Sequence, residues 1–252
     1  MTGMKGIRGV FFDLHGTLLL SPDLSAAWEE WHDAFHARMT EHGLTMSREE
    51  FKPYAEGLFE RPEPEYENAE MTLFERRVKD LGDRLGLDID HEHVRQTVEH
   101  IIEVWQRDMF LDPEAHEVLE ALGSRLKLAM ITNWDHAPRI PRLLSELGID
   151  EHFGEVVISD EAGVAKPDPE IFHAALDKTG LEPSEVAYVG DSSEDVQGSQ
   201  AAGVHPVLIR RDSPRGNRVF DPDAESMLRF YESGGCEGVT VIRRLRDLLD
   251  LF

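Results

Sequence analysis

Short apolar runs separated by helical patterns constrain the fold of this chain more than any other feature. Runs of this length and composition are typical of strands buried on both faces of a sheet. Strands that alternate with helices form βαβ units, so the pattern predicts an α/β fold with a parallel sheet. The predicted strands cover residues 7–12, 126–131, 155–158, 186–189 and 206–209.

The segments between these runs contain helix signals. Asp112 is a predicted N-cap with Pro113 at the first helical position. Residues 141–147 and 169–179 each begin with proline and continue with apolar residues at helical spacing. We also expect a closing helix over residues 239–249.

The alternation stops between residues 21 and 110, where no run is a convincing strand. Trp28, Trp31, Phe35 and Met39 recur three or four residues apart, as on one face of a helix. This pattern predicts a small helical domain, residues 21–110, inserted after the first strand and lying over the open end of the sheet. Residues 1–20 and 111–252 then form the core domain. Within the core, the segment from 210 to 237 is rich in glycine, proline and charge and predicts no regular structure.

The net charge of −24 excludes nucleic acid as a partner, because phosphates would be repelled across most of the surface. It is also a feature of proteins adapted to high salt, which is an alternative to an ordinary acidic surface. A local metal ion and a lysine can still outweigh a distant negative surface, so the charge does not exclude an anionic substrate.

Other features of composition bear on location. No apolar run reaches the roughly 18 residues that a membrane helix needs, so no membrane partner is expected. The first residues show no cleavage signature, and the single cysteine, Cys236, cannot form an internal disulfide. We therefore expect a cytoplasmic protein, monomeric or homodimeric.

Polar residues follow the predicted strands where each strand ends. In open α/β sheets this edge is where ligands bind. A carboxylate follows the first strand in Phe12-Asp13-Leu14-His15-Gly16-Thr17, and Lys166 precedes the helix that starts at residue 169. The remaining residues of this kind are Thr132, Asn133, Asp191 and Asp195.

These residues form four motifs, which contain Asp13, Thr132 with Asn133, Lys166, and Asp191 with Asp195. In this order the motifs resemble those of the haloacid dehalogenase-like hydrolase superfamily. The resemblance covers residues 7 to about 209 and implies a Rossmann-like core with a mobile cap, here the helical insert. It implies that Asp13 is a nucleophile that forms a covalent aspartyl intermediate. Mg²⁺ would be held by Asp13, Asp191 and the backbone carbonyl of His15, with Asp195 in support.

The resemblance also implies roles in substrate binding for Thr132, the backbone around Asn133, and Lys166. A carboxylate attacks a phosphate dianion poorly because both groups are negative. Mg²⁺ and Lys166 would remove this repulsion and stabilise charge in the transition state. The implied activity is a Mg²⁺-dependent phosphatase of a small phosphorylated metabolite.

The motifs depart from the common phosphatase pattern at His15, where a second aspartate normally transfers protons. Histidine can do this work near neutral pH, so we expect His15 to donate a proton and later to activate water. The departure leaves two alternatives open. One is a 2-haloacid dehalogenase, although that branch lacks the acidic residue found here at Asp191. The other is a catalytically degenerate binding protein of the same fold.

Overall fold

The computed structural model describes residues 4–59, 61–64, 70–211 and 238–252, and its core is a six-stranded sheet. All neighbouring strands are parallel, in the order β5-β4-β1-β6-β7-β8. The predicted α/β fold is therefore confirmed, and all five predicted strands are present. The strands are β1 (Gly9–Phe12), β4 (Lys127–Thr132), β5 (Glu155–Ile158), β6 (Val186–Gly190), β7 (His205–Ile209) and β8 (Thr240–Ile242).

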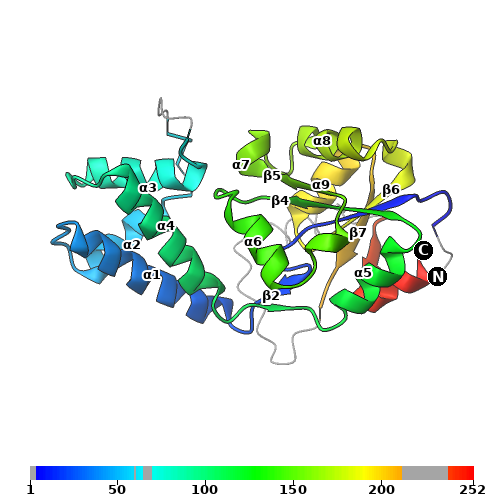
Figure 1. The fold of residues 1–252 in the computed structure, drawn as a ribbon, viewed down its shortest axis with the longest axis horizontal. Coiled ribbons are helices and arrows are strands. Elements are labelled where there is room, and N and C mark those ends of the chain that lie inside the picture. Colours follow the sequence, from blue (N-terminus) through cyan, green and yellow to red (C-terminus); the bar gives the residue numbers. More distant parts are fainter. Residues whose placement is uncertain (1–3, 60, 65–69, 212–237) are drawn as a thin grey trace. The chain divides into compact units, whose positions relative to one another are not determined.

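Helices cover both faces of this sheet (Figure 1). The chain leaves β1 toward β4 and β5 in one direction, and then returns across β1 to β6 and β7 in the other. Because parallel crossovers are right-handed, the two directions place their helices on opposite faces. One face carries α5 (Ala115–Gly123) and α6 (Arg139–Glu146), and the other carries α8 (Pro169–Thr179) and α9 (Ser193–Ala201).

The sequences of the central strands are continuous apolar runs because both faces of these strands are buried. Every residue of β1 and β6 is buried, because helices pack on both faces. Phe11 and Tyr188 belong to the core beneath α8, where the Tyr188 ring meets Phe172 edge to face at 4.9 Å. The core thus fixes the ends of β1 and β6 beside each other.

The chain divides into two compact units, Met1–Ser21 with Phe110–Phe252, and Pro22–Met109. Within the first unit, β2 (Leu19–Leu20) and β3 (Phe110–Leu111) form a short antiparallel pair where the chain leaves and re-enters it. The described residues of the second unit are helical, as predicted for the insert. Its helices are α1 (Leu24–Glu41), α2 (Arg48–Glu56), α3 (Leu73–Arg84) and α4 (His91–Gln106).

Two predictions of local structure were wrong. Residues 239–249 do not form one helix: β8 adds to the sheet edge beside β7, and a 3₁₀ helix follows at Leu245–Asp250. The β-branched run Thr240-Val241-Ile242 suits a strand better than a helix. Helix α5 begins at Ala115 with Glu114 as N-cap, because the Ala115 N–H donates to the Asp112 carbonyl at 2.9 Å and closes a turn before the helix, although Asp112 Oδ1 does accept from the Glu114 N–H. The irregular segment predicted for 210–237 lies almost wholly outside the described residues.

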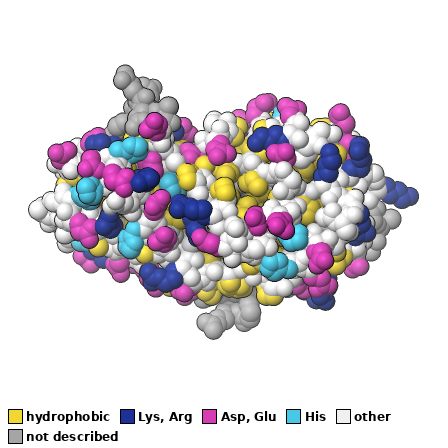
Figure 2. Space-filling view, viewed as in Figure 1, with side chains coloured by type: hydrophobic (Ala, Val, Ile, Leu, Met, Phe, Trp, Pro, Cys, Tyr) yellow, Lys and Arg dark blue, Asp and Glu magenta, His cyan; other side chains and the backbone are white. Residues whose placement is uncertain are grey.

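The surface of the described chain is rich in charge of both signs. Figure 2 shows Asp and Glu side chains scattered among Lys and Arg side chains over the visible face. Among the described residues, no helix combines the length and apolar character needed to cross a membrane. The cytoplasmic location stays a prediction.

Candidate functional site

Three adjacent strands end at one edge of the sheet and place polar residues there. Thr132 is the last residue of β4, Asp13 follows β1, and Asp191 follows β6. The Asp13 N–H donates to the Val189 carbonyl at 2.9 Å, so the sheet hydrogen bonds of this strand end at Asp13. The order in which strands are added reverses at β1, since β4 and β5 lie on one side of it and β6 and β7 on the other. Ligands bind at such a switch point in open α/β sheets.

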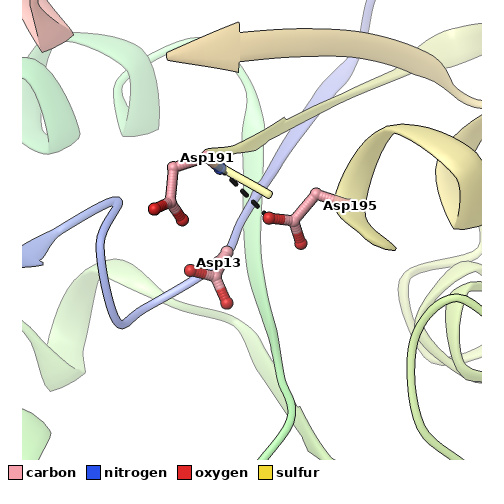
Figure 3. Close-up of side chains that lie close together, drawn as sticks. All are labelled: Asp13, Asp191 and Asp195. Carbon is pink, nitrogen blue, oxygen red and sulfur yellow. Dashed lines mark hydrogen bonds between the residues drawn. The ribbon is translucent and has the colours of Figure 1, made fainter. Parts of the chain in front are cut away.

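An acidic cluster forms at this edge from Asp13, Asp191 and Asp195. Figure 3 shows the three carboxylates converging from three elements, and one ligand atom from each lies within 4.8 Å of the others. Glycines permit this approach. A Cβ atom on Gly190 would lie 2.5 Å from the Asp195 Cβ, and one on Gly16 would lie 2.6 Å from the Asp191 Cγ. Neither distance is tolerated between real side chains, so both positions require glycine.

Lys166 is the buried cation of the site. It lies in the loop between α7 (Ser159–Ala162) and α8, and only 6% of it is exposed. Its Nζ donates to Asp13 Oδ1 at 2.7 Å, Asp195 Oδ1 at 2.8 Å and the Tyr188 hydroxyl at 3.0 Å. Burial lowers the pKa of Lys166, but the two carboxylates outweigh this effect and hold the pKa well above its ordinary value. The ammonium is therefore permanently charged and fixed.

Asp195 is saturated by hydrogen bonds from the protein. Its Oδ1 accepts from Lys166 and Tyr188, and its Oδ2 accepts from the Asp191 and Ser192 N–H groups and the Ser192 hydroxyl. Burial opposes ionisation, but Lys166 and these donors bring the pKa of Asp195 below its ordinary value. The side chain that was predicted as a metal residue is thus placed to orient the loop of Asp191 and to fix Lys166.

Asp13 presents a different pattern. Its Oδ1 is held by Lys166, whereas its buried Oδ2 has no hydrogen-bond partner among the described residues. Burial raises the pKa of Asp13 to about 6, with Asp195 adding to the effect and Lys166 opposing it. A buried carboxylate oxygen without a donor, beside Asp191, is what a hard cation such as Mg²⁺ would satisfy. The residues present therefore fit the predicted metal.

Asn133 serves the site through the backbone of Lys166. Its Oδ1 accepts from the Lys166 N–H at 2.8 Å, and its Nδ2 donates to the Lys166 carbonyl at 3.0 Å and to Glu194 Oε2 at 3.2 Å. Through these contacts the Asn133 side chain fixes the backbone of the loop that carries Lys166. Thr132 is 1% exposed at the end of β4. Its predicted contact with a phosphoryl group stays a prediction.

His15 lies at the rim of the cluster, and its imidazole stacks on the Trp134 indole. The two ring centroids are 4.6 Å apart and the planes differ by 11°. Burial, with Lys166 and Arg139 nearby, lowers the pKa of His15 to about 3. This shift favours the neutral imidazole over the charged form. Its roles as proton donor and later as proton acceptor stay predictions.

Sequence reasoning gave no role to Tyr188 or Thr17. The Tyr188 hydroxyl contacts Lys166, Asp195 and the Ile131 carbonyl, and the Thr17 hydroxyl donates to Asp191 Oδ1 at 3.2 Å. A signal for Tyr188 was available, because a phenol in an apolar central strand needs a partner for its hydroxyl.

Comparison with known families and proteins agrees with this geometry. Residues 7–203 match the model of the haloacid dehalogenase-like hydrolases. The chain is 44% identical over 121 residues to haloacid dehalogenase-like hydrolase domain-containing protein 3 of Mus musculus, a match covering 44% of this chain and 47% of that protein. It thus spans about half the length of the first curated relatives that it matches. A longer match, 30% identical over 222 residues, covers 81% of both this chain and the phosphoglycolate phosphatase of Salmonella choleraesuis.

Among solved structures, the fold is similar to that of 2-haloacid dehalogenase from Pseudomonas syringae pv. Tomato DC3000. The TM-score is 0.63 at 23% identity, over 97% of both chains. At this identity the likeness concerns the fold alone.

Proposed function

The chain belongs to the haloacid dehalogenase-like hydrolase family, and from this premise we propose that it is a Mg²⁺-dependent phosphatase of a small phosphorylated metabolite. The observation that carries the proposal is the asymmetry of Asp13. One carboxylate oxygen is bound by Lys166, and the other is buried without a partner beside Asp191. A second argument is the relative of Salmonella choleraesuis, which is named as a phosphatase of a small phosphorylated acid.

Asp13 is the proposed nucleophile. Attack by its carboxylate on phosphorus would form an aspartyl phosphate and break the bond from phosphorus to the leaving oxygen, which would take a proton from His15 and depart as the alcohol. Water would then hydrolyse this acyl phosphate. Lys166, held 2.7 Å from Asp13 Oδ1, would orient the attacking group and offset part of the charge that gathers in the transition state. Thr132, at the end of β4, would donate to the phosphoryl group.

Asp13, Asp191 and the His15 carbonyl are the proposed Mg²⁺ ligands, and Asp195 would support them through the loop of Asp191. When bound, Mg²⁺ supplies positive charge that reduces repulsion between the carboxylates and a phosphate dianion. His15 is the proposed proton carrier, because a bound phosphate dianion would raise its pKa from the low value that burial sets. The ring would then protonate the leaving oxygen and later accept a proton from water. The helical unit, Pro22–Met109, is the proposed cap that limits access of water and selects the substrate.

Phosphate release from a panel of small phosphomonoesters, with Mg²⁺ and with chelator, tests the proposal. We expect turnover that stops with chelator and returns with Mg²⁺. Asp13→Asn should reduce turnover by several powers of ten. Asp177→Asn is the control, because it changes an exposed carboxylate on α8.

Two outcomes would overturn the proposal. Chloride release from a 2-haloacid in the presence of chelator would favour the dehalogenase alternative. Binding of Mg²⁺ with no turnover of any ester would favour a binding protein.

A further inference from the structure

Arg211 lies outside the acidic cluster but binds the loop that packs against it. Its guanidinium donates to the Gly16 carbonyl at 2.7 Å and to the Thr17 carbonyl at 2.7 Å. It also binds Asp112 Oδ2, through Nη2 at 2.8 Å and Nε at 3.2 Å. One side chain therefore joins two segments that are about a hundred residues apart in the sequence.

These segments are the two by which the chain leaves and re-enters the core unit. Gly16 and Thr17 precede β2, and Asp112 directly follows β3. Leu19 pairs with Leu111, and the Asp112 N–H donates to the Leu18 carbonyl at 2.8 Å. Arg211 thus binds the end of this small β-ladder at the residues nearest to the acidic cluster.

The same loop supports Asp191. The Gly16 backbone packs directly against the Asp191 carboxylate, which leaves no room for a Cβ atom. Thr17 is held by two partners, since its hydroxyl donates to Asp191 and its carbonyl accepts from Arg211. A shift of this loop would therefore change the support of the Asp191 carboxylate.

From these contacts we propose that Arg211 is a positioning residue for the cation site, acting with Asp112 through Gly16 and Thr17. The assignment rests on the proposed function, because Asp191 is taken there as a Mg²⁺ ligand. The guanidinium suits this role because its rigid fork of five donors reaches three acceptors at once. A lysine would supply the charge for Asp112, which is only 6% exposed, but could not hold both carbonyls in the same geometry.

Calorimetric titration of the metal-free full-length chain with Mg²⁺ tests the proposal, using Arg211→Gln and Arg211→Lys. Loss of an outer support of a metal ligand commonly weakens metal binding about 10- to 100-fold, and we expect a loss of this size in both variants. Arg8→Gln is the matched control, since Arg8 is an exposed arginine that pairs with one carboxylate, Glu185. Its Kd for Mg²⁺ should equal that of the wild type.

Hydrogen exchange gives a second measurement that does not depend on the metal. The Gly16 N–H donates to the Leu19 carbonyl at 2.8 Å, and its exchange should be faster in both Arg211 variants because the loop is released. An unchanged Mg²⁺ affinity in folded Arg211→Gln would overturn the assignment and leave the proposed function standing. A wild-type chain that binds no Mg²⁺ would overturn the proposed function, and this assignment with it.

Discussion

Replacement of Tyr188 by phenylalanine tests whether the buried network around Lys166 has the importance that its geometry indicates. The change removes one oxygen and leaves the ring, which packs 4.9 Å from Phe172. The lost hydroxyl accepts from Lys166 at 3.0 Å and lies 3.0 Å from Asp195 Oδ1 and 3.1 Å from the Ile131 carbonyl. Because no apolar contact is removed, any loss of stability comes from these polar contacts.

The expected magnitude follows from what the partners retain. Lys166 keeps both carboxylates, and Asp195 Oδ1 keeps Lys166, so neither charge is left alone. Removing one partner of buried groups costs about 1–3 kcal/mol of unfolding free energy. For about 2 kcal/mol in a chain of this size, Tm should fall by roughly 4–8 °C. If about 1 kcal/mol of this also affects the transition state, turnover should fall roughly 5-fold.

Urea unfolding of the wild type, Tyr188→Phe and Tyr54→Phe measures the effect. Tyr54 lies at the surface, 36% exposed, so its loss of a hydroxyl should change stability by less than about 0.5 kcal/mol. A Tyr188→Phe variant as stable as Tyr54→Phe would refute the argument that the hydroxyl fixes Lys166. An unchanged rate with lower stability would limit Tyr188 to a structural role.

Two further predictions concern the acidic cluster. Gly16→Ala would strain the backbone, since φ is +88°, and its new Cβ atom would collide with the Asp191 carboxylate. Gly43→Ala would strain the backbone similarly, at φ +96°, but has open space around the new atom. Urea unfolding should therefore show a greater loss for Gly16→Ala than for Gly43→Ala, where about 1 kcal/mol is expected; equal losses would contradict the collision. In chelator, the pKa of Asp13 is raised to about 6 from its ordinary value of 3.8, so its contribution to stability is full below about pH 4 and is lost as pH rises through 6. The stability of the wild type relative to Asp13→Asn should fall by at most about 3 kcal/mol between pH 4 and pH 7, and a difference that does not depend on pH would contradict this assignment.

The sequence predicted the central strands and the edge at which their polar residues meet. This was possible because β1 and β6 are buried on both faces and therefore read as uninterrupted apolar runs. Parallel pairing then requires that Asp13 and Asp191 emerge at the same edge. Only the periodicity and the positions of a few polar residues were needed for this part of the site.

Other features depend on contacts that no local pattern shows. Asp112 has the sequence context of an N-cap, and its Oδ1 accepts from the Glu114 N–H, but the sequence gives no sign that its Oδ2 binds Arg211, about a hundred residues away. Residues 240–242 carry a local strand signal in their β-branched side chains, and pairing with the edge of β7 decides against the helix that the segment after them suggests. The sequence alone suggests an ordinary histidine pKa for His15, whereas burial and Lys166 lower this pKa in the folded chain. In each case tertiary structure overrides the local signal.

The charge of the site explains how a strongly acidic chain could act on an anionic substrate. Three carboxylates and one ammonium lie within a few ångströms of each other, which leaves two negative charges when all are ionised. Asp195 is compensated by Lys166 and by three donors near Ser192, so the excess falls on Asp13 and Asp191. A divalent cation would neutralise this excess, whereas a second lysine would not. The same balance predicts that a phosphate dianion binds the metal-free site poorly, so affinity for inorganic phosphate should rise when Mg²⁺ is added. Phosphate affinity that does not depend on Mg²⁺ would show that the acidic cluster does not govern anion binding.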